Sequence, residues 1–174
     1  MTFPPARPGD PVSAIETPAL VVDLAAYGRN LDRMAASLAA TGARLRPHAK
    51  THKCPVIARN QIERGAVGVC CQTVGEAEAM VLGGVGDVLV TNQVVTPGKI
   101  RRLAALAKQA SIAVCVDDAS NVDALAAAAE SLKTKLSVYV EVDVGQHRCG
   151  VDPGEPAVSL ARVVARHASL RFGG

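Results

Sequence analysis

A regular alternation of short apolar segments with helix-like segments most constrains how this chain can fold. The apolar segments begin near residues 43, 67, 87, 112 and 136, a spacing of about 20 to 25 residues, and another begins at Leu170. Segments with helical periodicity lie between them, at residues 55–64, 74–82, from Thr96-Pro97 onward, after Asp118 and at 155–167. The predicted caps of three of these helices are Thr73 in a Thr-x-x-Glu pattern, the Thr96 hydroxyl, and Asp118 or Ser120. Repeated βαβ units form parallel sheets, so the sequence predicts an α/β fold.

The chain before this alternation has two parts. Residues 1–15, rich in Pro and Gly, are expected to be a flexible leader; they lack the charged start and apolar run of a secretory signal. Residues 17–23, TPALVVD, are typical of a short extended segment. Asp23 can then cap a helix whose apolar residues recur every three or four positions as far as Thr41-Gly42.

Two parallel architectures compete, a doubly wound open sheet and a TIM-type (β/α) barrel. No G-x-G-x-x-G sequence follows the first strand, which disfavours a dinucleotide-binding sheet. A closed barrel takes eight strands and about 250 residues, whereas this chain offers about five or six strands. We therefore expect residues 16–174 to form the N-terminal portion of a barrel that is incomplete in this chain.

Composition excludes several classes of function. A formal charge of +3 with scattered basic residues, and only 2% aromatic residues, argues against nucleic-acid binding. No apolar run is long enough to span a bilayer. The five cysteines are odd in number and contain no C-x-x-C pair, a pattern that favours a reduced, cytoplasmic protein.

The candidate chemistry lies at the carboxyl ends of the expected strands, which meet at one rim. Lys50 follows the first strand, in the run RPHAKTHK at residues 46–53, and a lysine crowded by Arg46 and Lys53 is suited to Schiff-base chemistry. An ordinary solvated loop lysine is the alternative on spacing alone. The other polar groups expected at this rim are Gln72, Asn92, Asp117 and the loop 143–148.

Two further features allow more than one interpretation. His48 and His52 are four residues apart, as in some zinc sites, but no acidic third ligand lies nearby, so supporting roles are favoured and no metal site is assigned. Arg148, in a glycine-flanked loop after the strand that begins near 136, could fix an anion or could pair with Asp143 or Asp152 to hold the loop.

Four stretches together resemble the fold-type III pyridoxal-phosphate (PLP) enzymes of the alanine racemase N-terminal kind, within the D-threonine aldolase and D-serine dehydratase-like group. They are TPALVVD at 17–23, RPHAKTHK at 46–53, GVCCQTVGEAE at 68–78 and VDVGQHRCGV at 142–151. The resemblance implies a barrel in which Lys50 forms the Schiff base with PLP. Arg148 would lie on the side of the phenolic oxygen of PLP, and Gln72 is carried over as a cofactor-binding residue.

For function, the resemblance implies a cytoplasmic lyase that cleaves a D-β-hydroxy amino acid to glycine and an aldehyde. D-Serine dehydratase and amino-acid racemase activity remain alternatives, as does a truncated, catalytically silent protein. The family's phosphate loop, and a C-terminal β domain with a divalent metal site, would lie outside residues 1–174, so no metal ligand is expected here. A homodimer is the candidate oligomeric state of the full-length form.

Overall fold

The computed structural model describes residues 6–174 and contains one parallel sheet of five strands. Its strands lie side by side in the order of the sequence: β1 (Val69–Cys71), β2 (Asp87–Val90), β3 (Ser111–Val116), β4 (Leu136–Val140) and β5 (Leu170–Phe172). A doubly wound sheet would reverse its strand order at a switch point. The unbroken order, with a helix between each pair, therefore confirms the predicted barrel-type arrangement, of which five strands are present.

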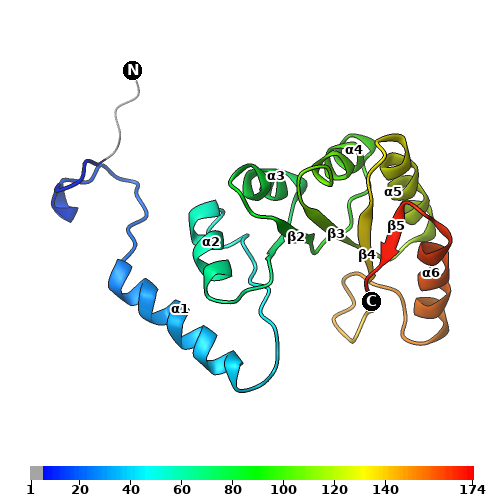
Figure 1. The fold of residues 1–174 in the computed structure, drawn as a ribbon, viewed down its shortest axis with the longest axis horizontal. Helices are drawn as coiled ribbons and strands as arrows, with labels where there is room; N and C mark the ends of the chain where they lie inside the picture. Colours follow the sequence, from blue (N-terminus) through cyan, green and yellow to red (C-terminus); the bar gives the residue numbers. More distant parts are fainter. Residues whose placement is uncertain (1–5) are drawn as a thin grey trace.

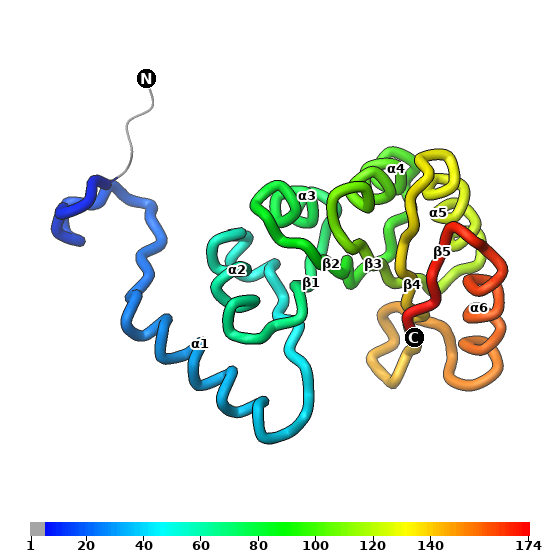
Figure 2. The backbone as a smooth tube through the Cα atoms, in the orientation of Figure 1, coloured from blue at the N-terminus to red at the C-terminus, as the bar shows by residue number. Residues whose placement is uncertain are grey.

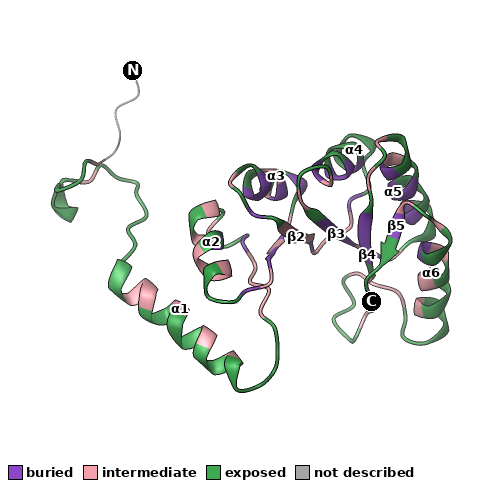
Figure 3. Cartoon of the chain, viewed as in Figure 1, coloured by how far each residue is buried: buried purple, intermediate pink, exposed green. Residues whose placement is uncertain are grey.

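Four helices cover one side of this sheet and follow one another around it (Figure 1). They are α3 (Val74–Leu82), α4 (Pro97–Leu106), α5 (Ala119–Ser131) and α6 (Glu155–Arg166). The core lies between the helices and the sheet, where Figure 3 shows the buried residues. Met80, Leu103 and Leu125 are fully buried there from the helices. Burial of this apolar layer is the main favourable contribution to folding.

Side chains alternate between the two faces of the sheet. Val88, Val90 and Val114 point into the helix-covered core and are fully buried. The intervening positions face the other side and are more polar: in the strand register Ala113 pairs with Ser137, and Cys115 pairs with Tyr139. In a (β/α) barrel this second face is the interior, so a set of small and polar side chains lines the concave side of the sheet.

The helix starts confirm most of the predicted caps. Asp23 Oδ1 accepts the Ala26 N–H at 2.9 Å at the start of α1 (Leu24–Ala39), and Asp118 Oδ1 accepts the Asn121 N–H at 3.1 Å. Thr73 Oγ1 accepts the Glu76 N–H at 3.2 Å, as the Thr-x-x-Glu pattern predicts. The cap predicted from Thr96 is wrong in one respect, since its hydroxyl makes no capping hydrogen bond. Pro97 supplies the start of α4 instead.

The first part of the chain stands apart from the sheet (Figure 2). Helix α1 contacts α2 (Pro55–Glu63), with Asn60 Nδ2 3.2 Å from the Tyr27 hydroxyl. Residues 17–23, predicted to be a short extended segment, belong to no helix or strand; Asp23 has an extended backbone, and Leu20 is fully exposed. The expected leader, 1–15, lies partly outside the described residues; its described part contains a short 3-10 helix, Val12–Ala14.

The strand predicted for residues 43–47 is only partly formed. The Val67 N–H donates to the Leu45 carbonyl at 2.9 Å, and a single parallel bridge joins His48 to Cys70. This segment therefore runs beside β1 as an irregular edge rather than as a regular strand, with Pro47 removing one backbone donor. Among residues 6–174, no helix is both long and apolar enough to cross a membrane.

Candidate active site at the carboxyl edge of the sheet

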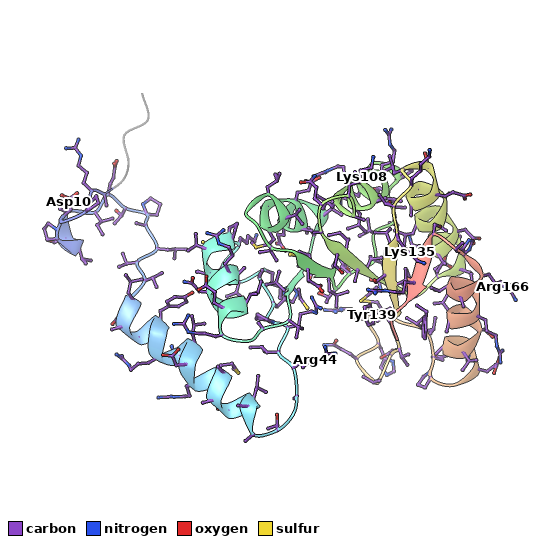
Figure 4. All side chains as sticks on the ribbon, viewed as in Figure 1. Asp10, Arg44, Lys108, Lys135, Tyr139 and Arg166 are labelled. Carbon is purple, nitrogen blue, oxygen red and sulfur yellow. The ribbon has the colours of Figure 1, made fainter. Side chains whose placement is uncertain are left out.

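The segments expected to carry chemistry all leave the same edge of the sheet. Because the strands are parallel, the residues that directly follow them share one edge. Gln72 follows β1, Asp117 follows β3, and the loop that contains Arg148 follows β4. Figure 4 shows Tyr139, near the end of β4, towards this edge, whereas Lys108, which precedes β3, lies on the opposite side of the molecule.

Lys50 lies in a tight turn that β1 anchors to this edge. The Ala49 N–H donates to the Cys70 carbonyl at 2.7 Å, and the Cys70 N–H donates to the Pro47 carbonyl at 2.8 Å. The turn is closed by the Lys53 N–H, which donates to the Ala49 carbonyl at 2.7 Å, and Lys53 has a φ of 51°. Ala49 is fully buried, whereas Lys50 is exposed, so the buried neighbour fixes the turn and leaves the amine accessible.

The two histidines of this turn bind backbone. His48 Nδ1 accepts the Lys50 N–H at 3.2 Å, and His52 Nδ1 accepts the Cys54 N–H at 3.0 Å. Burial lowers the pKa of both imidazoles below the ordinary histidine value. The zinc alternative therefore finds no support in the turn, and among residues 6–174 no group of three or more His, Cys, Asp or Glu is arranged to hold a metal ion.

The cations beside Lys50 have partners of their own. Arg46 Nη1 is 2.7 Å from Asp87 Oδ1, and Lys53 Nζ is 3.7 Å from Glu76 Oε1. Each of these two cations therefore has a carboxylate within ion-pair distance. Arg46 also lies under Gly68, where an added Cβ would come within 2.5 Å of Arg46 Nη1.

Hydrogen bonds tie the loops of this edge to one another. Glu76 Oε2 accepts the Gln72 N–H at 2.8 Å, and Asn92 Nδ2 donates to the Gln72 carbonyl at 3.5 Å. Farther along, Gln93 Nε2 donates to Glu141 Oε2 at 2.6 Å. Gln72 is thus fixed through its backbone, and its half-buried side chain lies beside His48.

Arg148 is carried by a loop that Asp143 organises. Asp143 Oδ1 accepts the N–H groups of Gly145 and His147 at 2.9 and 3.0 Å, and the other carboxylate oxygen is 2.9 Å from His147 Nδ1. Hydrogen bonds from the His147 and Gly145 backbone lower the pKa of Asp143. Asp143 therefore holds its own loop, and the alternative pairing of Arg148 with Asp143 or Asp152 is not found among the described residues.

Lys50 and Arg148 do not touch. Three strands separate the segment that carries Lys50 from β4, the strand before the Arg148 loop. With neighbouring strands about 4.8 Å apart, that segment and β4 are on the order of 19 Å apart along the sheet.

The cysteines near this edge are poor nucleophiles. Burial raises the pKa of Cys71 to about 12, and burial together with the Glu141 carboxylate raises the pKa of Cys115 to about 11. A thiol acts as a nucleophile in its deprotonated form. Neither of these two thiols is therefore a candidate nucleophile at this edge.

Sequence reasoning missed three side chains whose partners are distant in the sequence. Thr91 follows β2 and lies 3.1 Å from His48 Nε2, and Glu141 follows β4 and accepts from Gln93. Asp87, the first residue of β2, pairs with Arg46 at the amino end of the sheet. All three contacts join residues more than 40 positions apart, so local patterns do not reveal them.

The fold and this edge define a barrel-type α/β domain whose polar site lies where the parallel strands end. The family model described as "Alanine racemase, N-terminal domain" matches residues 22–174. This chain belongs to that family.

Solved structures and characterised proteins give closer similarities. The crystal structure of D-threonine aldolase from Filomicrobium marinum is 48% identical, with a TM-score of 0.96, covering 99% of this chain and 47% of that one. The 3-hydroxy-D-aspartate aldolase of Paracoccus denitrificans is 47% identical over 172 residues, 98% of this chain and 44% of the relative.

A more distant relative is a dehydratase. D-threo-3-hydroxyaspartate dehydratase from Delftia sp. HT23 is 32% identical, with a TM-score of 0.79, covering 91% of this chain and 42% of that one. A variant of D-threo-3-hydroxyaspartate dehydratase has been solved in a metal-free form. The chain thus spans less than half the length of each of these relatives.

Proposed function

We propose that this chain is the N-terminal barrel part of a PLP-dependent lyase that cleaves D-β-hydroxy amino acids of the D-threonine type to glycine and an aldehyde. The observation that carries the proposal is the placement of Lys50, an exposed amine in a turn fixed to β1 at the carboxyl edge of a parallel sheet. Similarity to two aldolases that act on D-β-hydroxy amino acids supports this reaction and substrate class.

The residues at this edge offer the types of functional group that PLP requires. The cofactor is an aldehyde that carries a phenolic oxygen and a phosphate, so it needs an amine and nearby cations. Lys50 would hold it covalently, Arg148 would lie beside the phenolic oxygen, and the Gln72 amide would donate a hydrogen bond to it. Both Lys50 and Arg148 are exposed, without a carboxylate partner among the described residues. When bound, PLP supplies an electron sink for the bonding electrons released at the substrate Cα.

For the organisation of the protein we propose that residues 16–174 belong to the PLP-binding barrel and that residues 1–15 precede it. We assign no residue of this chain to a metal or to the phosphate of PLP. A divalent metal that binds the substrate's β-hydroxyl, and a homodimer, remain predictions from the family resemblance.

Reductive trapping tests the role of Lys50. The full natural chain is incubated with PLP, reduced with borohydride, digested and mapped by mass spectrometry. We expect the pyridoxyl group on Lys50, its loss in Lys50→Ala, and its retention in Lys108→Ala, a surface lysine remote from the carboxyl edge. Labelling that persists in Lys50→Ala at wild-type yield would refute the proposal.

Dehydration of the substrate is the second candidate, because the D-threo-3-hydroxyaspartate dehydratase covers the same part of this chain. The two reactions give different products: an aldolase releases glycine and an aldehyde, whereas a dehydratase releases ammonia and a 2-oxo acid. Product analysis with D-threonine and 3-hydroxy-D-aspartate, with divalent metal added, distinguishes them. Activity that does not depend on Lys50 would contradict both, and absence of any product would favour the catalytically silent alternative.

A further inference from the structure

His48 makes hydrogen bonds through both of its ring nitrogens at the centre of the candidate site. Its Nδ1 is 3.2 Å from the Lys50 backbone nitrogen, and its Nε2 is 3.1 Å from the Thr91 hydroxyl. The parallel bridge to Cys70 fixes the His48 backbone against β1. A half-buried imidazole therefore joins the turn of Lys50 to the end of β2.

The hydrogen-bond directions define one tautomer. The Lys50 N–H can only donate, so His48 Nδ1 must be an unprotonated acceptor. The Thr91 hydroxyl donates to the Cys71 carbonyl at 3.3 Å, which leaves the Thr91 oxygen to accept from His48 Nε2–H. The result is a directed chain from the Lys50 amide through a neutral imidazole and a hydroxyl to the backbone of β1.

We propose that His48 is a positioning residue for Lys50: as a neutral Nε2–H imidazole it holds the Lys50 amide, and thereby aims the Lys50 side chain from the turn toward the ligand. This inference deepens the proposed function, since it rests on Lys50 being the residue that binds PLP. This role does not require contact with the cofactor, because each hydrogen bond in the chain joins two groups of the protein itself.

Protonation of His48 would remove the acceptor that its Nδ1 offers to the Lys50 N–H. A charged imidazole carries a hydrogen on Nδ1, which would then face the hydrogen of the Lys50 N–H. Lys50, in the same turn, and burial both oppose this charge, whereas Glu76 at the start of α3 and the Gln72 amide favour it. Thr91, which faces His48 from the end of β2, is uncharged and opposes neither state. We therefore expect the Lys50 turn to be ordered at neutral pH and released in acid.

Two substitutions separate the two bonds of His48. In His48→Asn, Oδ1 occupies the place of Nδ1 and can accept the N–H two residues ahead, as in an Asx turn. In His48→Gln, the side-chain amide can reach Thr91 but leaves the Lys50 N–H without its acceptor. His167→Asn is the control, because His167, which precedes β5, bonds Asp123 of α5.

Hydrogen exchange of the Lys50 amide, measured by NMR on the full natural chain without PLP, tests the proposal. We expect the protection factor of Lys50 to fall about tenfold in His48→Gln and to stay within about threefold of wild type in His48→Asn and His167→Asn. In the wild type it should also fall when the pH is lowered from about 8 to about 5, but not in His48→Asn.

The proposal is overturned if the Asn and Gln variants behave alike, or if Lys50 protection in the wild type does not change with pH. The Cys70 amide, which donates to the Pro47 carbonyl, reports on the surrounding fold. Loss of its protection together with that of Lys50 would show that His48 stabilises the sheet edge as a whole, which also overturns the proposal. Failure of PLP to label Lys50 would refute the proposed function and leave these exchange results unaffected.

Discussion

Replacing Gly150 with alanine should loosen the loop that carries Arg148. Gly150 has a φ of +103°, and its N–H donates to Asp117 Oδ2 at 3.0 Å. A Cβ at this position would come within 2.6 Å of the Asp143 backbone nitrogen and 2.7 Å of the Val142 carbonyl carbon. Both neighbours are backbone atoms of the paired segment at the end of β4, where the Asp143 N–H donates to the Val151 carbonyl at 2.9 Å. Neither can move without breaking this pairing.

The expected cost has two parts. An L-residue held at positive φ is strained by about 1 kcal/mol, and forcing a methyl group into a closely packed site adds about 1–3 kcal/mol. The unfolding free energy should therefore fall by about 2–4 kcal/mol in Gly150→Ala. Gly145 is the matched control, since it lies in the same loop with φ +114° and nothing within 4 Å of an added Cβ. Gly145→Ala should cost about 1 kcal/mol.

Urea unfolding of the full natural chain measures this difference, and trypsin cleavage after Arg148 reports on local opening of the loop. We expect the urea midpoint of Gly150→Ala to lie about 1 M below that of Gly145→Ala. If the strain is released locally instead, the two midpoints should agree and trypsin should cleave the Gly150→Ala loop faster. Equal midpoints, to within about 0.5 kcal/mol of stability, together with equal cleavage rates would refute the steric argument.

Three further predictions follow from the caps and the buried titratable groups. Thr73→Ala should destabilise the protein by about 1 kcal/mol in urea unfolding, because Thr73 caps α3, whereas Thr96→Ala should change little; equal losses would contradict this. The unfolding free energy should decrease as the pH falls below about 6.5, because the pKa values of His48 and His52 are lowered in the folded protein and the unfolded chain therefore binds protons first. Replacing both histidines with Asn should flatten this pH profile. Stability that rises in acid would be inconsistent with the prediction. Cys115, its pKa raised to about 11, should react with iodoacetamide near pH 8 far more slowly in the folded than in the urea-unfolded protein, by peptide mapping; similar rates would show that its burial is incomplete.

Much of the fold follows from local patterns. The expected helix at 74–82 matches α3 residue for residue, because Thr73 and Glu76 define its start and Gly83 its end. The strands β2 to β5 lie where apolar β-branched runs predict them, since parallel strands covered by helices need continuous apolar segments. The stretch at 43–47 is less regular than expected. A strand at the edge of a sheet depends on a partner on one side only, and its own sequence does not determine how many bonds form.

The candidate site was only partly predictable. The run RPHAKTHK singled out Lys50, and the parallel order of strands placed Gln72 and the Arg148 loop on the same edge. The sequence did not reveal that Asp87 and Glu76 pair with the cations on either side of Lys50, or that Asp143 holds its own loop rather than Arg148. Which carboxylate meets which cation depends on distances across the sheet.

By itself the sequence determined the α/β class and most of the helix boundaries, and it singled out Lys50 as the candidate lysine. Periodicity, capping residues and turn residues act over a few positions, so they can be read from neighbouring residues. Only the tertiary structure decided the second partner of His48. Its Nε2 meets the Thr91 hydroxyl, which lies 43 positions away in the chain and 3.1 Å away in space. Contacts of this kind exist only once β1 and β2 pair, so the setting of the Lys50 turn is a property of the folded sheet rather than of the motif that contains it.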